Sequence, residues 1–376
     1  MAGRSVFQDV GTDQKQHPVT PGGIENPATV GRTAVAQWLW GLVGLIILMI
    51  IIGGLTRLTD SGLSITQWDP VMGAIPPLNT TDWDAAFDLY KTTSEWALQN
   101  SLMTMAEFKV IYWWEWGHRQ LGRFIGLYWF MGFAIFYAMG RIPRPRVLPL
   151  FMIGPFIGVQ GLIGWVMVHS GLQGTRIDVA SYWLMTHLGA AFALLGYVVW
   201  QAQILGRSEA DLIQARRARE GIFGLSTGLM YFVFVQILLG ALVAGIDAGR
   251  NYTDWPLMAG GFLPPDIFAL DPWWRNFFED DGLVQFIHRM TAYALFVFGL
   301  YVGFKGAKSP NKATRKAFGR VGLLLILQMV IGVVTVMHSA PLHWAILHQF
   351  FGVLLWVAVI RGRFLVGYPL VSSVRG

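Results

Sequence analysis

The chain has 376 residues, of which 54% are hydrophobic and only 13% are charged, and its mean hydropathy is +0.48. Because a soluble domain usually carries about 25% charged residues, this composition indicates a protein whose main solvent is lipid. The cysteine-free sequence excludes disulfides, iron–sulfur clusters, thiolate-ligated haem and zinc–cysteine sites, and the distribution of its net charge of +6 argues against a nucleic-acid partner.

The first segment, residues 1–35, is polar and carries both acidic and basic side chains. It lacks the apolar core of a signal peptide and the acid-poor character of a mitochondrial presequence. It is therefore expected to form a short cytoplasmic tail.

Eight apolar stretches follow this tail. A helix needs about 20 mostly apolar residues to cross the hydrocarbon core of a bilayer, and an open strand would leave its backbone groups unpaired in lipid. The stretches that qualify are 37–57, 111–139, 147–169, 182–205, 223–246, 284–304, 320–338 and 342–361. The sequence therefore predicts an all-α integral membrane protein with eight transmembrane helices.

The basic residues predict the orientation of these helices, because cytoplasmic loops carry an excess of Lys and Arg. Most Lys and Arg residues fall in the N-terminal tail, in the 141–146, 207–220 and 305–320 connections and in the C-terminal segment 361–376. Most acidic residues fall in the opposite loops. Both termini are therefore expected in the cytoplasm, with loops 58–110 and 247–283 outside.

An internal repeat relates the two halves of the chain. His118, His169 and His187 recur in the same order, and in similar surroundings, as His288, His338 and His348. The repeat divides the chain into a four-helix unit at 36–206, a cytoplasmic linker at 207–222 and a second four-helix unit at 223–376. Because each unit has an even number of helices, the sequence predicts a parallel pseudo-two-fold repeat about an axis along the membrane normal.

Four of these histidines are candidate haem ligands. Histidine inside a membrane is costly and normally faces a polar partner or a cofactor in the bundle interior. His118 and His187 are expected at similar depth, roughly 8–10 Å below the outer ends of their helices, and His288 and His348 meet the same condition. Two imidazoles at matched depth can bind one haem iron from both sides. The alternative is that each histidine is a core residue hydrogen-bonded across helices.

Three arginines beside these ligands, Arg119, Arg123 and Arg289, are candidates for binding haem propionates, which need cations. The alternative is that they snorkel to the lipid headgroups. The remaining histidines are His169 and His338, which either hydrogen-bond propionates or end their helices in the interface, and His343 and His17, which receive no role.

One residue breaks the symmetry between the halves. Glu115 lies three residues before His118 on the same helical face, whereas the counterpart before His288 is the neutral Gln285. A carboxylate next to a haem often carries protons or stabilises positive charge. The alternative is a salt bridge to Arg119 or Arg123. The asymmetry suggests a reactive first site and an auxiliary second one.

These residues resemble the haem A synthase family, in its cysteine-free proteobacterial and mitochondrial branch. The resemblance covers nearly the whole chain after residue 35 and rests on the Glu-x-x-His-Arg run 115–119, on His187, on the pair His288 and His348, and on the tandem four-helix plan. It implies an oxidoreductase of cytochrome oxidase assembly in a bacterial inner membrane, with both haem sites toward the periplasm.

The resemblance also implies specific roles for the two units. His118 and His187 would hold the substrate haem O near the catalytic Glu115, and His288 and His348 would hold a haem b that passes electrons. A porphyrin methyl group would be hydroxylated twice, and the gem-diol would lose water to give the formyl group of haem A. The implied partners are the haem O synthase, other oxidase assembly factors, an electron acceptor and, in a homo-oligomer, further copies of the chain.

Two other classes of membrane protein remain as alternatives. A di-haem b-type electron carrier or quinol-linked reductase would hold two permanent haems and modify neither. A transporter with polar midplane sites is disfavoured, because the histidines are expected near the outer surface. The Glu115–Gln285 asymmetry separates the synthase from the electron carrier.

Overall fold

The computed structural model describes residues 27–174 and 176–370, so the tail histidine His17 lies outside the described residues. In this part of the chain, eight helices are long and apolar enough to cross a membrane. They are α1 (Pro27–Leu58), α4 (Met105–Ala138), α6 (Ile153–Gly171) with the short α5 (Val147–Phe151) before it, α7 (Ser181–Leu205), α9 (Phe223–Gly245), α11 (Asp281–Ala307), α12 (Lys312–Met337) and α13 (Leu342–Gly367). The predicted all-α class and the eight spans are confirmed.

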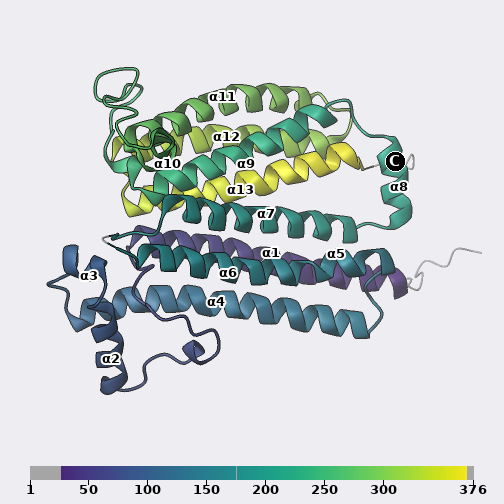
Figure 1. Cartoon of the computed structure of the whole chain (residues 1–376). Coiled ribbons are helices and arrows are strands. Elements are labelled where there is room, and N and C mark those ends of the chain that lie inside the picture. Colours follow the sequence, from purple (N-terminus) through teal and green to yellow (C-terminus); the bar gives the residue numbers. More distant parts are fainter. Residues whose placement is uncertain (1–26, 175, 371–376) are drawn as a thin grey trace, which may run out of the picture.

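The long helices form two sets of four, which we call the first unit (α1, α4, α6, α7) and the second unit (α9, α11, α12, α13). In each unit every helix contacts the next along the chain, and the fourth helix also contacts the first. The units meet where α7 packs on α9 and α13 and where α1 packs on α13 (Figure 1). The two units thus have the same order of neighbours, while the pseudo-two-fold axis remains a prediction.

Close packing of α7 on α13 joins the units near the middle of the bundle. Gly196 on α7 allows the Trp356 ring to approach so closely that a Cβ at this glycine would lie 3.1 Å from it. The Trp356 indole N–H also donates a 2.8 Å hydrogen bond to the carbonyl of Phe192. Small residues serve helix contacts in lipid because packing and hydrogen bonding, rather than the hydrophobic effect, drive helix association there.

The third predicted span, 147–169, is interrupted at Met152 between α5 and α6. Pro155 has no N–H to donate to the carbonyl four residues earlier, so the helical ladder is broken at this point. Two carbonyls near the break accept side-chain donors instead: the indole of Trp129 binds Leu150 at 3.1 Å, and the hydroxyl of Tyr197 binds Pro149 at 2.9 Å.

Figure 1 shows α2 (Thr80–Tyr90), α3 (Ser94–Leu98) and α10 (Asn276–Glu279) at one end of the bundle, which we call the loop end, and α8 (Glu209–Arg217) at the other. The helix α4 begins at Met105, before the expected residue 111, because Thr104 and Glu107 form a capping box. Its additional turns pack against α2 through Phe87 and Tyr90. His118 is therefore much farther from the start of its helix than His187, contrary to the expectation of similar distances.

A nearly buried arginine ties the two units together at the loop end. The guanidinium of Arg57, at the end of α1, lies 2.9 Å from Asp60, 3.2 Å from Asp178 and 3.0 Å from Asp247. Asp60 and Asp178 belong to loops of the first unit, whereas Asp247 follows α9 in the second. One guanidinium therefore contacts three carboxylates from three separate segments.

The Arg57→Ala variant is expected to lower the free energy of unfolding by about 3 kcal/mol, because removing one partner of a buried ion pair leaves the others uncompensated. Denaturation in detergent would measure this change. Arg250→Ala is the matched control, since Arg250 is 44% exposed and lies 3.6 Å from Asp247. Such an exposed pair contributes about 0–1 kcal/mol. Equal losses in the two variants would contradict the linking role of Arg57.

Glu95 of α3 is a buried carboxyl outside the spans. Burial, with repulsion from Asp60 and Asp178, raises its pKa to about 8 from the ordinary 4.5. Between these two pH values the folded protein holds a proton that the unfolded chain releases. Stability should therefore fall as pH rises from 4.5 to 8, by at most about 1.4 kcal/mol per pH unit, and level off above.

Hydrogen exchange of the α2 and α3 amides, corrected for the intrinsic pH dependence, would measure this effect. Glu95→Gln should remove most of the pH dependence, because the amide stays neutral throughout. Asp84→Asn, which changes an exposed carboxylate of α2, should leave it in place. A pH dependence that survives in Glu95→Gln would assign it to another group.

Candidate active site

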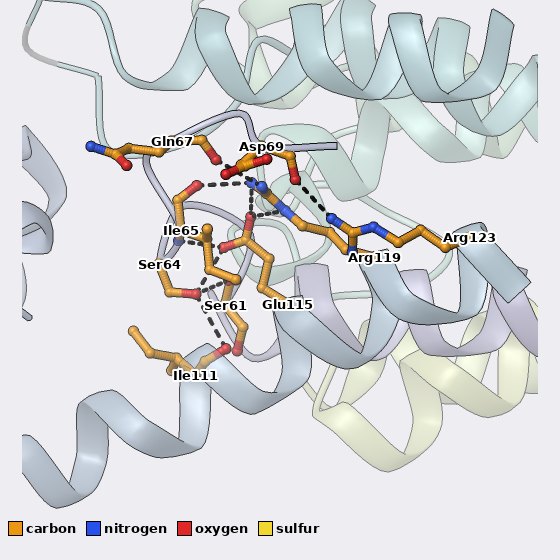
Figure 2. Close-up of polar contacts among 9 residues, drawn as sticks. All are labelled: Ser61, Ser64, Ile65, Gln67, Asp69, Ile111, Glu115, Arg119 and Arg123. Atoms are coloured by element: carbon orange, nitrogen blue, oxygen red, sulfur yellow. Dashed lines mark hydrogen bonds and ion pairs between the residues drawn. The ribbon is translucent and has the colours of Figure 1, made fainter. Parts of the chain in front are cut away.

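Glu115 lies at the centre of a polar cluster on α4 and is only 3% exposed. Its Oε2 accepts hydrogen bonds from the Ser64 hydroxyl at 2.8 Å and from the Ile65 N–H at 2.7 Å. Its Oε1 accepts two from Arg119, at 3.1 and 2.6 Å (Figure 2). Hydrogen bonds to a charged group contribute about 1.5–3 kcal/mol each, so these four offset much of the cost of burying a carboxylate. The salt bridge between Glu115 and Arg119, one of the alternatives from the sequence, is present in the structure.

The two arginines of this cluster attach the α1–α2 loop to α4. Arg119 also donates to the carbonyls of Gln67 at 3.0 Å and Ile65 at 2.8 Å. Arg123 donates to the carbonyls of Pro70 at 3.0 Å and Asp69 at 2.9 Å rather than to Glu115, and Figure 2 shows the bond to Asp69. Its second terminal nitrogen, Nη1, is buried and has no hydrogen-bond partner in the described chain.

The second unit repeats this attachment without the carboxylate. Gln285 is 2% exposed and donates to the Ala248 carbonyl at 2.7 Å. Arg289 donates to the carbonyls of Tyr252 at 2.7 Å and of Asp254 and Leu257 at 3.0 Å each. The Nε of Arg289 is buried without a partner among the described residues. The two sites therefore share their geometry and differ in charge.

His118 on α4 and His187 on α7 lie close enough to interact electrostatically. Each ring packs against a glycine of a neighbouring helix. A Cβ at Gly53 would lie 3.1 Å from His118 Nε2, and a Cβ at Gly164 would lie 3.1 Å from His187 Cε1. Both glycines therefore make room for an imidazole.

His288 on α11 and His348 on α13 form an equivalent pair. Cβ atoms at Gly240 and Gly332 would lie 3.1 and 2.9 Å from the Cε1 atoms of these two rings. In this unit a glutamine accompanies each ring. The amide nitrogen of Gln236 lies 3.0 Å from His288 Nδ1, and that of Gln328 lies 3.3 Å from His348 Nε2.

Sequence reasoning missed these facing helices, although a signal was present. A glutamine stands four residues before the glycine in three of the four helices, at Gln160–Gly164, Gln236–Gly240 and Gln328–Gly332, and Met49 takes its place before Gly53. Residues four apart share a helical face. Among the four histidines, His118 is therefore the one whose facing helix carries a methionine, Met49, where the other facing helices carry a glutamine.

Both pairs fit haem iron better than a bare metal ion. The described residues contain no group of three or more His, Cys, Asp or Glu side chains that could hold a metal ion. Haem needs only one or two axial ligands from the protein. Two paired imidazoles can supply these, and the Nδ1 atoms of His187 and His348 are buried without a hydrogen-bond partner in the described chain.

The remaining histidines lie outside these pairs. His169 stacks on Trp165 at a ring-centroid distance of 6.1 Å, and with Arg119 and Trp68 both residues line a cavity of about 40 Å³. His338, at the end of α12, lies with its Nδ1 2.8 Å from the Val334 carbonyl. Of these two, His169 alone thus lies next to the Arg119 cluster.

Comparison with known proteins shows the family of the chain. The family model described as cytochrome oxidase assembly protein matches residues 36–360. The chain is 56% identical to a protein of Dinoroseobacter shibae named haem A synthase, across 99% of this chain and 98% of that protein. It is 53% identical to a haem A synthase of a Ruegeria species across the full length of both, and 50% identical to that of Paracoccus denitrificans across 100% of this chain and 99% of the relative. The chain therefore belongs to the COX15-CtaA family of cytochrome oxidase assembly proteins.

Proposed function

We propose that the chain is a haem A synthase, an oxidoreductase that converts a methyl group on the porphyrin of haem O into the formyl group of haem A. Relatives of 50–56% identity carry this name. The observation that carries the proposal is the difference between two otherwise matched sites: the buried Glu115–Arg119 ion pair stands beside the first histidine pair, and the neutral Gln285 stands beside the second.

In this proposal the first pair is the substrate site. His118 and His187 bind the iron of haem O, and Gly53 and Gly164 leave room for their rings. The carboxylate of Glu115 then lies one helical turn from an iron ligand. Arg119 and Arg123 contribute positive charge toward the propionates, and the free Nη1 of Arg123 is available for this contact.

The second pair is the resident cofactor site. His288 and His348 hold haem b, which when bound supplies electron transfer to and from the substrate site. Gln236 and Gln328 orient the two rings, as hydrogen-bond partners of metal-binding histidines generally do. Arg289, with an unused Nε, balances the propionate charge.

Oxidation of a methyl to a formyl group proceeds through two hydroxylations, and the resulting gem-diol loses water. With water as the source of oxygen, each hydroxylation replaces a C–H bond of the methyl carbon with a C–O bond, passes two electrons to an external electron acceptor and releases two protons. A proton must therefore be accepted, or positive charge stabilised, close to the methyl group. Glu115 meets this need, because Arg119, Ser64 and the Ile65 N–H hold its carboxylate in one place. A fixed charge stabilises a developing charge without reorganising during the reaction.

In the proposed setting both termini lie in the cytoplasm of a bacterial cell, and the histidine pairs lie toward the periplasm. Haem O arrives from the haem O synthase, and haem A leaves toward the oxidase through assembly factors. Both haems are bound within the bilayer-spanning bundle, which suits ligands that are themselves largely apolar.

The decisive experiment expresses the chain in cells that make haem O but no haem A, followed by extraction of the haems for chromatography and mass spectrometry. Haem A, identified by the mass of its formyl group, is the expected product. If only haem b and unchanged haem O were recovered, the chain would instead be a di-haem electron carrier.

A further inference from the structure

One segment of the α1–α2 loop has an unusual composition for a loop in water. Residues 70–78 read PVMGAIPPL and contain no polar side chain. Val71, Met72, Ile75 and Leu78 are 77%, 64%, 57% and 76% exposed. Contiguous exposed apolar side chains of this kind mark a contact surface for a protein, a ligand or a membrane.

The position of this segment along the bundle indicates what its apolar side chains contact. Gly53 meets His118 five residues before α1 ends, so His118 lies roughly 8 Å inside the loop end of the bundle. Gln120 and Arg123 lie farther along α4, and they donate to the carbonyls of segment 69–74. Figure 1 shows the segment between α1 and α2 running alongside α4, within the length of the bundle. The segment is therefore level with the histidine pair.

Part of the backbone of this segment, residues 69–74, is hydrogen-bonded to side chains of α4. Irregular backbone at membrane depth has to be covered by protein rather than exposed to lipid, so only the side chains of such a segment can face the acyl chains. The carbonyls of Asp69, Pro70, Gly73 and Ala74 all accept hydrogen bonds from the side chains of α4. The Met72 N–H donates to the Asp69 carboxylate, at 2.9 Å. Water would satisfy these groups without such partners.

The exposed apolar surface of residues 70–78 continues onto α4. Phe124 and Leu127, the next outward-facing residues of α4, are 51% and 57% exposed on a helix that spans the membrane. The second unit has a similar loop, in which Phe262 and Leu263 are exposed and Trp255 donates to the Tyr293 hydroxyl at 2.8 Å. Tyr293 follows His288 by five residues, as Arg123 follows His118.

We infer that residues 70–78 form a re-entrant segment whose apolar side chains contact the acyl chains of the leaflet at the loop end, and that this segment separates the lipid from the first histidine pair. Arg119 connects the same loop to Glu115, since it binds both the loop carbonyls and the carboxylate. Given the proposed function, an isoprenoid-bearing haem dissolved in the membrane meets this segment first. The lipid contact itself does not depend on that function.

The cysteine-free sequence allows a direct test. Val71→Cys and Ile75→Cys would each carry the only thiol, labelled with a nitroxide in full-length protein reconstituted into phosphatidylcholine–phosphatidylglycerol vesicles. Leu102→Cys is the matched control, because Leu102 is also apolar and 94% exposed but precedes α4, beyond the bundle. Collision rates with oxygen, which partitions into lipid, and with a water-soluble nickel chelate would be measured by paramagnetic resonance.

At positions 71 and 75 we expect oxygen collisions to exceed nickel collisions several-fold, and at position 102 we expect the reverse. Nickel collisions that predominate at both test positions would overturn the inference and place the segment in water. If a labelled variant folds poorly, the rate of modification of the unlabelled thiol by a membrane-impermeant maleimide gives the same decision, slow for lipid and fast for water. Haem A production by the same samples is scored separately, so failure of the proposed function remains distinguishable.

Discussion

The Glu115→Gln variant is expected to keep its fold and its haem b but to form haem A at least about 100-fold more slowly, the usual range for loss of a general acid or base. The substitution removes the negative charge while keeping the size of the side chain. One amide oxygen can still accept from Arg119 or from Ser64 and Ile65, so the loop retains part of its attachment. The ratio of haem A to haem O in extracted haems would measure the effect.

Two controls separate chemistry from structure in this experiment. Asp84→Asn removes an exposed carboxylate from α2 and should leave the ratio of haem A to haem O unchanged. If the loop stays in place, the Glu115→Gln substitution should leave the collision rates of a nitroxide at position 71 unchanged. Normal haem A formation in Glu115→Gln would reduce Glu115 to an anchor for the loop and remove it from the proposed chemistry.

Much of the architecture could be predicted because the bilayer imposes a simple rule on sequence. A run of about 20 apolar residues has few outcomes other than a spanning helix, and all eight such runs are helices in the structure. Local spacing was equally informative at Glu115 and Arg119, which are four residues apart and therefore neighbours on one helical face. Their ion pair at 2.6 Å is the alternative that the sequence had left open.

Features that depend on tertiary contacts were beyond sequence reasoning. The helices α2 and α3 are too short to be stable alone, and α2 is held by Phe87 and Tyr90 packing on Phe108 of α4. Asp247 follows Arg57 by 190 residues, so nothing local announces their ion pair. The recurring spacing of glutamine and glycine marks the glycines that face the histidines, but it does not say which residues they meet, because the rotation of one helix against another decides this.

The predicted distance of His118 from the outer end of its helix is wrong, because α4 begins at Met105. The helix α4 begins earlier than the predicted span, since its first turns extend beyond the bundle and pack on the α2 helix. The contact of His118 with Gly53 gives a better measure, because Gly53 lies five residues from the end of α1. His187, six residues into α7, is at a similar level.

Alanine at His288 or His348 is expected to remove the haem b spectrum from the purified protein almost completely, because each substitution deletes one of two axial ligands. Alanine at His118 or His187 should leave that spectrum in place and abolish haem A formation. The measurements are the reduced-minus-oxidised optical spectrum and the haem extract of each variant. All four side chains are imidazoles that pack against a glycine, so each pair is the control for the other.

Substitutions at the glutamines test the same assignment, because they distinguish a histidine that binds haem iron from a buried core histidine. Gln236 contacts the His288 ring, so Gln236→Leu should keep the haem b content but shift its reduction potential, as removal of a hydrogen bond to an axial ligand does. If His288 were only a polar core residue, the variant would change stability and leave the potential untouched. A haem b spectrum retained in both His288→Ala and His348→Ala would contradict the assignment of the second pair. A spectrum lost equally from all four alanine variants would instead mean that the two sites are not independent.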